Sequence, residues 1–326
     1  MNVLVTGGAG YIGSAVTRVL LGEGHAVTVL DSLVTGHRGA VPAGAELVVA
    51  DTRDASSVAS ILRMARSEAV VHLAAISQVG TSVIRPRDYF DNNVRGALSL
   101  LDAMLDVGVG RIVFSSTAAV YGEPERCPIE ESAPTRPVSP YGDTKLMIER
   151  VLQRYGVAYG LEHTSLRYFN AAGAMTDAGE DHRPETHLIP KLLQSALGNA
   201  PPITVFGTDY PTPDGTCIRD YVHVEDLARA HALALGAPGR PGGRVYNLGC
   251  GDGFSVAEVL ASVRRVTGRA VPVEYGARRA GDPAVLVASS AAIGRELGWS
   301  PRFADLDRFV ESAWAWMVEH PAGYAD

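Results

Sequence analysis

The chain has 326 residues, of which 46% are apolar and 20% charged, so length and composition fit one large globular domain or two fused ones. A formal net charge of −7 argues against nucleic acid as a partner, because phosphate backbones are bound by clustered positive charge. No apolar run approaches the ~18 residues of a membrane helix and no basic segment precedes a long apolar run, so the sequence predicts a cytoplasmic protein with no membrane partner.

From residue 1 to about 170, short apolar runs rich in β-branched residues alternate with longer helical stretches. The predicted strands are 2–5, 26–30, 46–50, 69–73, 111–115 and 163–167, and the predicted helices are 11–21, 56–64, 91–106 and 140–155. Nearly continuous apolar strands separated by helices indicate a parallel sheet covered on both faces. We therefore expect an α/β fold with a doubly wound, parallel Rossmann sheet.

The pattern changes after residue 173, where polar and proline-rich segments interrupt the alternation. We predict helices at 187–197, 224–235, 256–267 and 306–318, and strands at 203–206 and 221–224. The expected organisation is a nucleotide-binding domain over 1–175, with a returning segment near 216–240. A smaller α/β lobe over 176–326 would close over the carboxyl edge of the sheet.

A glycine-rich segment follows the first predicted strand and opens the first predicted helix. Gly8, Gly10 and Gly13 satisfy the pattern GxGxxG, while Gly7, Gly10 and Gly13 satisfy GxxGxxG. Such glycines allow a tight turn and let the backbone approach a pyrophosphate, whose charge is favoured at a helix N-terminus. At the first strand of a βαβ unit, this motif predicts dinucleotide binding.

Asp31 ends the second predicted strand, 24 residues after Gly7. A carboxylate at this position hydrogen-bonds the ribose hydroxyls of NAD and repels the 2′-phosphate of NADP. The sequence therefore predicts NAD as the cofactor.

Tyr141 and Lys145 stand four residues apart in a predicted helix, so their side chains share one face. A lysine ammonium and a nicotinamide cation lower the pKa of a neighbouring phenol, which makes tyrosine a usable general base. Only two of the 29 basic residues are lysines, Lys145 and Lys191, so a lysine at this spacing is less easily explained by chance. We predict Tyr141 and Lys145 as catalytic residues.

Three hydroxyl residues, Ser115, Ser116 and Thr117, end the fifth predicted strand, whose carboxyl end faces the ligand crevice of such a sheet. Thr117 is expected to bridge a substrate hydroxyl and Tyr141. The alternative is that these hydroxyls cap a turn, and this explanation suits Ser115 and Ser116 better than Thr117. The cysteines, in contrast, are few and far apart and show neither disulfide nor metal-ligand spacing, so no metal is predicted.

At this point the motifs carry a family resemblance. The segments TGGAGYIGS, DNNV, SSTAAVYG, SPYGDTK and LRYFNAAGA resemble the extended short-chain dehydrogenases/reductases. Later segments resemble the UDP-glucose 4-epimerases within that family: GEDHRPETHLIP, FGTDYPTPDGTCIRDYVHVEDLA, YNLGCGDGFSV and RRAGDPA. The resemblance covers essentially the whole chain.

The resemblance implies a homodimer formed through helices 91–106 and 140–155, and two sets of binding residues. NAD would be bound by Gly7, Gly10, Tyr11, Ile12, Gly13, Asp31, Ser32, Asp51, Thr52, Leu73, Ala74, Ala75, Asn92, Ser115, Tyr141, Lys145 and Phe169. The UDP-sugar would be bound by Thr117, Tyr141, Asn170, Leu188, Thr204, Phe206, Arg219, Arg279, Asp282 and Leu286.

The sequence departs from the family pattern at three places. Ser77 stands where the family often has a lysine that contacts NAD, Thr186-His187 replaces an asparagine pair of one subgroup, and Thr117 replaces a serine. Ser77 puts that one cofactor contact in doubt. None of the departures removes the acid–base pair.

The implied activity is interconversion of UDP-glucose and UDP-galactose through a transient 4-keto sugar. Epimerisation of UDP-N-acetylglucosamine, alone or as a second activity, is the alternative. A nucleotide-sugar 4,6-dehydratase is disfavoured because Ala118 and Ala119 follow Thr117 where that chemistry needs an Asp-Glu pair. A dinucleotide-sensing module without turnover would not need Tyr141, Lys145 and Thr117.

Overall fold

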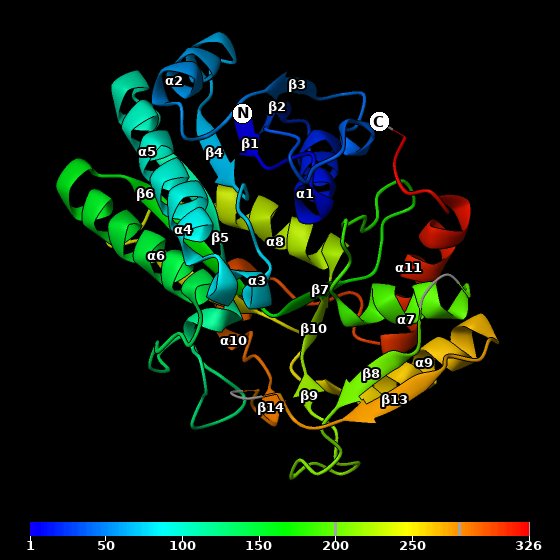
Figure 1. Cartoon of the computed structure of the whole chain (residues 1–326). Coiled ribbons are helices and arrows are strands. Elements are labelled where there is room, and N and C mark those ends of the chain that lie inside the picture. Colours follow the sequence, from blue (N-terminus) through cyan, green and yellow to red (C-terminus); the bar gives the residue numbers. More distant parts are fainter. Residues whose placement is uncertain (199–200, 280–281, 326) are drawn as a thin grey trace.

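The computed structural model describes residues 1–198, 201–279 and 282–325 (Figure 1). Its main sheet has seven strands, all parallel, in the order β11-β6-β5-β4-β1-β2-β3. The strands are β1 (Asn2–Thr6), β2 (Ala26–Asp31), β3 (Glu46–Val49), β4 (Ala69–His72), β5 (Arg111–Thr117), β6 (Glu162–Tyr168) and β11 (Arg244–Leu248). The predicted doubly wound parallel sheet is confirmed. Its order reverses between β1 and β4, where such sheets bind ligands beyond the carboxyl ends of the strands.

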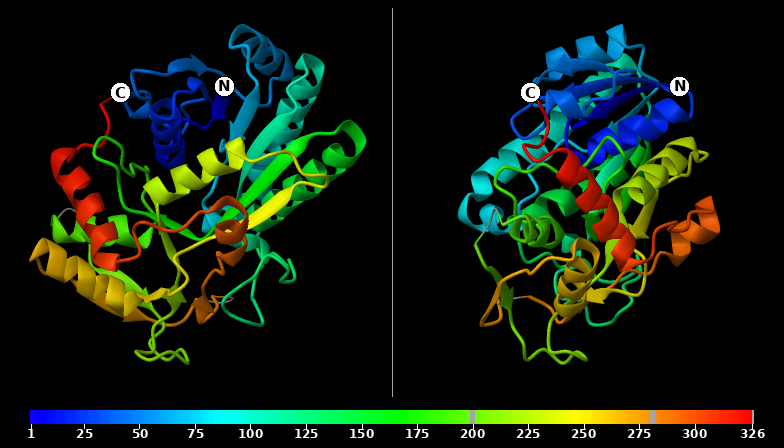
Figure 2. Two further views of the ribbon diagram at one scale, coloured as in Figure 1. Left: turned by 180° about the vertical axis from the view of Figure 1, so that it is seen from behind. Right: turned by 90° about the vertical axis from the view of Figure 1, so that its right-hand side faces the viewer.

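Helices cover both faces of this sheet (Figures 1 and 2). On one face lie α1 (Tyr11–Gly22) and α8 (Val224–Gly236), and on the other α2 (Ala55–Met64), α5 (Gly96–Val107) and α6 (Pro140–Tyr159). The side chains of β1 alternate between the two cores: Val3 and Val5 pack with α1 and α8, and Leu4 packs with α2 and α5. Because both faces are buried, a central strand such as β1 is apolar at most of its positions, facing either way.

The segment before α5 is less regular than the single predicted helix 91–106. It contains α3 (Val79–Ile84), α4 (Pro86–Tyr89) and a π-helix, η2 (Phe90–Arg95), that runs directly into α5. The wider turn places the Asn93 side chain in the interior, where it accepts from the backbone N–H of Ile76 (2.9 Å) and donates to the carbonyl of Ile76 (3.0 Å). The π-helical turn thus fixes the loop that leaves β4, as such turns often do near functional sites.

A second layer of elements lies beyond the carboxyl edge of the sheet (Figure 1). Its helices α7 (Leu188–Ala196), α9 (Val256–Thr267) and α11 (Leu306–Glu319) pack around buried Phe309. Short strands complete it: β8 (Ile203–Phe206) beside β13 (Val273–Gly276), β7 (Asn170–Ala172) beside β10 (Tyr221–His223), and β9 (Ile218–Arg219) between β12 (Phe254–Ser255) and β14 (Val285–Leu286). The remaining elements are η1 (Arg38–Ala40), η3 (Ala118–Val120) and α10 (Ala291–Leu297).

The end of the chain returns to its beginning. The Tyr324 ring stacks on His37, with 5.5 Å between ring centroids, and Figure 1 shows both termini on the same side of the molecule. In the part of the chain that the structure describes, no helix combines the length and apolar character needed to cross a membrane.

Candidate functional site

The glycine-rich loop lies directly against the chain that leaves β4. Gly7 has φ +75°, and a Cβ on it would come 2.6 Å from the backbone nitrogen of Ala74. A Cβ on Gly13 would come 2.0 Å from the Gly7 carbonyl oxygen. Gly10 is the N-cap of α1 and has no side chain to satisfy the first N–H groups of the helix. These residues therefore form a side-chain-free cradle at a helix N-terminus, which suits a pyrophosphate.

Asp31 is buried at the carboxyl end of β2, next to this cradle. Its carboxylate accepts hydrogen bonds from the backbone N–H groups of Ala9 (3.0 Å) and Leu33 (2.9 Å). Burial raises the pKa of Asp31, and the two N–H bonds oppose that rise. The carboxylate both orders the glycine-rich loop and lies where a dinucleotide ribose is bound in sheets of this type.

Most of the other predicted cofactor residues emerge at the same edge of the sheet. Asp51 and Thr52 follow β3, and Leu73, Ala74 and Ala75 follow β4. Asp51 is bound by Arg53, with 2.6 Å between Nη2 and Oδ2, and this ion pair lowers the pKa of Asp51.

Three more predicted cofactor residues, and the position where the sequence departs from the family, are Ser32 directly after β2, Asn92, Phe169 and Ser77. Ser32 is exposed, whereas Phe169 is buried directly after β6. Asn92 donates through its side-chain amide to Asn93 Oδ1 (3.0 Å), and Ser77 is exposed in the loop after β4. Asn93, which was not predicted, is the residue that anchors this loop, and the asparagine pair in DNNV was the available signal.

The first turns of α6 carry the predicted acid–base pair. Ser139 caps the helix by accepting from the backbone N–H of Gly142 (3.2 Å), and Pro140 occupies its first position. Tyr141 and Lys145 are both buried, and Lys145 Nζ lies 5.9 Å from the centre of the Tyr141 ring. Lys145 Nζ donates to the backbone carbonyl of Ser115 (2.8 Å), so α6 is tied to the end of β5.

Burial dominates the electrostatics of this pair. It raises the pKa of Tyr141 far above its ordinary value, against a smaller opposite effect of the Thr117 hydroxyl. Burial also lowers the pKa of Lys145 to about 7, opposed by the carboxylate of Glu149. These side chains alone keep the phenol neutral near pH 7, so a further positive charge beside it is needed to form a phenolate.

The three hydroxyls that end β5 have different partners. Ser115 Oγ lies 3.0 Å from His231 Nε2, and Ser116 Oγ donates to Glu149 (2.5 Å). Thr117 Oγ1 accepts from the backbone N–H of Ala119 (3.2 Å) and also interacts with the Tyr141 phenol. Thr117 is thus both a turn cap and a neighbour of Tyr141.

A buried ion pair supports the site from behind and was not predicted from the sequence. Glu149 accepts from Arg167 Nε (2.9 Å) and Nη2 (2.5 Å), and both side chains are only 7% exposed. Arg167 also donates to the Tyr121 hydroxyl (2.9 Å). Because Glu149 stands one helical turn after Lys145, its carboxylate favours the lysine ammonium.

Apart from Thr117 and Tyr141, the predicted substrate residues lie in the second layer. Arg219 pairs with Asp282, and the Arg279 guanidinium lies 4.1 Å from the centre of the Phe206 ring on β8, which also carries Thr204. Asn170 begins β7, where its side-chain amide donates to the Asp220 carbonyl (2.7 Å). The structure thus joins Arg219 with Asp282 and Arg279 with Phe206, pairs that sequence spacing could not reveal.

Asp220 explains why Arg219 is held in place. Its buried carboxylate accepts from the backbone N–H groups of Cys250 (2.8 Å), Gly251 (3.1 Å) and Ala288 (2.9 Å). Through these bonds Asp220, which follows β9, connects its segment to the turn after β11 and to the chain after β14. In the Arg-Asp-Tyr motif the aspartate is therefore structural, while the arginine is paired with Asp282.

Leu286 is the register partner of Arg219, because β14 pairs with β9. Leu286 is partly buried and packs against a cluster that includes Tyr121 and Phe169, so it lies beside a predicted cofactor residue as well as within a packed cluster. Leu188 is the first residue of α7 and is partly buried against the core of the second layer.

Comparisons with known proteins agree with this arrangement. The sequence profile described as "NAD dependent epimerase/dehydratase family" matches residues 3–249. The UDP-glucose 4-epimerase of Corynebacterium glutamicum is 52% identical over 315 residues, covering 97% of this chain and 95% of that protein.

Solved structures give the same result. The UDP-glucose 4-epimerase of Brucella ovis in complex with NAD has a TM-score of 0.93 at 46% identity, with 99% of each chain covered. The Bifidobacterium longum enzyme in complex with NAD+ and UDP has a TM-score of 0.94 at 35% identity, with 99% of this chain and 100% of that chain covered. The chain belongs to the NAD-dependent epimerase/dehydratase family, as a member of its UDP-glucose 4-epimerases.

Proposed function

We propose that this chain interconverts UDP-glucose and UDP-galactose by inverting carbon 4 of the hexose. The observation that carries the proposal is the convergence of Tyr141, Lys145 and Thr117 at the carboxyl end of β5, beside the dinucleotide cradle. The names of the full-length relatives support it.

Tyr141 is the general base and acid in this proposal. NAD, when bound, would supply a reversible hydride acceptor for carbon 4. The phenolate oxygen of Tyr141 takes the proton of the sugar 4-hydroxyl as the carbonyl forms, and Thr117 orients that hydroxyl. The keto sugar then turns about its diphosphate, and Tyr141 gives the proton back on the new face.

Lys145 is proposed to stabilise the phenolate form of Tyr141. Burial disfavours the phenolate form of Tyr141. The ammonium of Lys145, which Glu149 favours, would stabilise that negative charge together with the nicotinamide cation of bound NAD. We propose that the remaining predicted cofactor residues also bind NAD. They would belong to a dinucleotide-binding domain made of residues 1–175 and a returning segment near 216–240.

We propose that the second layer binds UDP tightly and leaves the hexose free to rotate. Arg219 and Arg279 provide planar guanidinium groups for the diphosphate. Asn170, Leu188, Thr204, Phe206 and Asp282 complete the proposed site. Strong binding of UDP with loose binding of the sugar lets the intermediate stay bound without fixing one face.

A 4,6-dehydratase reaction needs an acid–base pair after the active-site threonine. Here Ala118 and Ala119 begin η3 and carry no titratable group. The same scaffold is therefore proposed to epimerise rather than eliminate.

Incubation of the purified protein with UDP-galactose tests the function. We expect UDP-glucose to form without added NAD, the same final ratio to be reached from either sugar, and NAD to be released on denaturation. A 4-keto-6-deoxy product would support a dehydratase, and no turnover by NAD-loaded protein would contradict the proposal.

Leu286 is proposed as the gate beside the 2-substituent of the sugar. We expect Leu286→Tyr to lower the kcat/KM ratio of UDP-N-acetylglucosamine to UDP-glucose by about 10- to 100-fold, because a larger side chain excludes the acetamide and steric discrimination is worth ~1–3 kcal/mol. Leu286→Phe, which adds the ring without the hydroxyl, is the matched variant. An unchanged ratio in both variants would show that Leu286 only packs in its cluster.

We also propose a homodimer formed through η2–α5 and α6. Leu98, Leu105 and Met147 are exposed apolar residues on these helices. Light scattering at micromolar concentration is expected to give twice the mass of the chain, and the double variant Leu98→Glu/Met147→Glu to give a smaller one. A monomeric parent would refute the dimer.

A further inference from the structure

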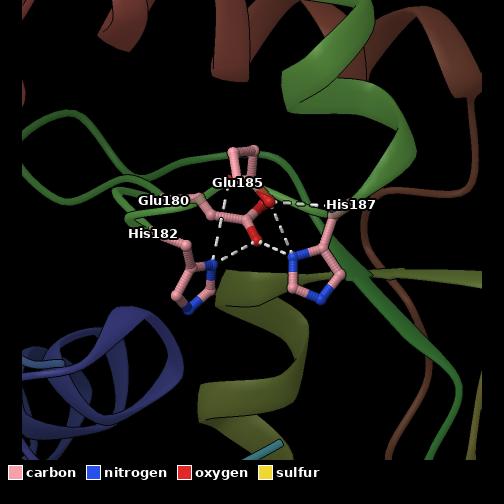
Figure 3. A group of neighbouring side chains, drawn as sticks. All are labelled: Glu180, His182, Glu185 and His187. Carbon is pink, nitrogen blue, oxygen red and sulfur yellow. Dashed lines mark hydrogen bonds and ion pairs between the residues drawn. The ribbon is translucent and has the colours of Figure 1, made fainter. Parts of the chain in front are cut away.

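Four potential metal ligands meet in the segment that joins β7 to α7. They are Glu180, His182, Glu185 and His187, and their ligand atoms all lie within 4.8 Å of one another. Figure 3 shows the two imidazole rings on either side of the Glu180 carboxylate, and each ring directs a nitrogen toward it. The cluster plays no part in the acid–base chemistry of Tyr141.

The spacing of the donors fits one small cation. His182 Nδ1 lies 2.9 Å from Glu180 Oε1 and 3.8 Å from Glu185 Oε2. His187 Nδ1 lies 2.7 Å from Glu180 Oε1 and 3.0 Å from Glu185 Oε1. Ligands of a tetrahedral zinc ion, each ~2.0–2.1 Å from the metal, are about 3.3 Å apart, which falls within this range of separations.

Charge also favours a cation here. The side chains of Glu180 and Glu185 are only 8% and 4% exposed, so two adjacent carboxylates are largely withdrawn from water. With neutral imidazoles the cluster carries two negative charges, and buried carboxylates are stable only when paired or bound to a metal. Protonation of both histidines is the competing way to neutralise the cluster.

The ligands are supported by their surroundings. Glu185 Oε1 accepts from the backbone N–H groups of Thr186 (2.6 Å) and His187 (2.7 Å), which fixes the orientation of the carboxylate. The His182 ring packs edge-on against Tyr11, with 6.4 Å between centroids. Hydrogen-bonded carboxylates such as Glu185 are typical of ordered metal sites.

We propose that Glu180, His182, Glu185 and His187 bind one Zn²⁺ ion per chain. Two imidazole nitrogens with two carboxylate oxygens match the tetrahedral preference of zinc, whereas Mg²⁺ and Ca²⁺ prefer oxygen ligands throughout. Four protein ligands complete the shell, so the site is structural. This proposal departs from the sequence-based expectation of no metal, which rested on the cysteines alone.

The ion would join the two layers of the molecule. Tyr11 at the start of α1 donates through its hydroxyl to the Gly173 carbonyl (2.5 Å), and His187 is the N-cap residue of α7. A metal bound by the cluster would hold the 180–187 segment, through His182, beside Tyr11 of the main-sheet layer. Through His187 it would also fix the start of α7.

Metal content and zinc titration test the proposal on full-length protein from which any affinity tag has been removed. We expect one zinc per chain by elemental analysis after dialysis, and a rise in Tm when Zn²⁺, but not Mg²⁺ or Ca²⁺, is returned to chelator-treated protein. The double variant His182→Gln/His187→Gln should lose the bound zinc and weaken zinc affinity by more than about 100-fold.

Three further variants keep the result interpretable. Glu185→Gln should weaken zinc binding on its own, and circular dichroism shows whether each variant is folded. His25→Gln and Cys127→Ser remove other potential ligands and should retain one zinc. Stoichiometric zinc in the double variant, or a parent that binds no zinc at micromolar concentration, would overturn the proposal and leave the cluster as an ion-pair network.

Discussion

Tyr141→Phe is expected to lower kcat for epimerisation by about 10²- to 10⁴-fold, the usual contribution of a positioned acid–base group. The substitution removes the one oxygen proposed to carry the proton and leaves the ring in its buried place. Because Lys145 keeps its bond to the Ser115 carbonyl, the end of β5 and the cofactor cradle are expected to stay as they are.

The measurement is single-turnover and steady-state conversion of UDP-galactose, together with the NAD content of the purified variant. Tyr246→Phe is the matched control, because that buried tyrosine donates to Glu296 on α10 and is not part of the proposed site. Full turnover by Tyr141→Phe, with NAD bound, would mean that another group is the base.

Glu149→Ala is expected to lower the free energy of unfolding by about 3–5 kcal/mol. The substitution leaves Arg167 buried with an unpaired charge, and breaking a buried ion pair from one side carries a cost of this size. It also removes the carboxylate that favours the Lys145 ammonium, so kcat is expected to fall as well.

Urea denaturation of the NAD-loaded proteins measures the effect. Glu311→Ala is the control, because Glu311 pairs with Arg308 on the surface and such pairs contribute ~0–1 kcal/mol. Glu149→Gln, which retains an acceptor for Arg167, should lie between the two. Equal stability of Glu149→Ala and Glu311→Ala would show that the Glu149–Arg167 pair is not critical to the fold.

Strands that are largely buried on both faces of the main sheet could mostly be predicted from the sequence. Strands that exist only because they pair with a distant segment could not. Six of the seven strands of the main sheet were predicted within a few residues. β11 was missed because Arg244 and Asn247 interrupt its apolar run and a loop rich in proline and glycine precedes it. Strands of two residues, such as β9 and β14, exist only through pairing between distant segments, which has no local pattern.

The same distinction applies to the site. Tyr141 and Lys145 could be predicted because helical spacing places them on one face. Arg219 and Asp282 are 63 residues apart, and only the family resemblance placed both in one predicted binding site. The roles of Asp220 and Asn93 depend on backbone groups of other segments, and the Glu/His cluster lies in an irregular segment without a period to read.

The position of β11 has a consequence for synthesis of the chain on the ribosome. β6 pairs with β11, which ends 80 residues further on, at Leu248. At ~5–20 residues per second, the outer edge of β6 stays unpaired for about 4–16 s after it is made. During that interval α8 is also still being made, so one face of the sheet is only partly covered. An open strand edge beside uncovered apolar residues invites pairing with other chains, so the nascent protein is most prone to aggregation, and most in need of a chaperone, just before residue 248 emerges.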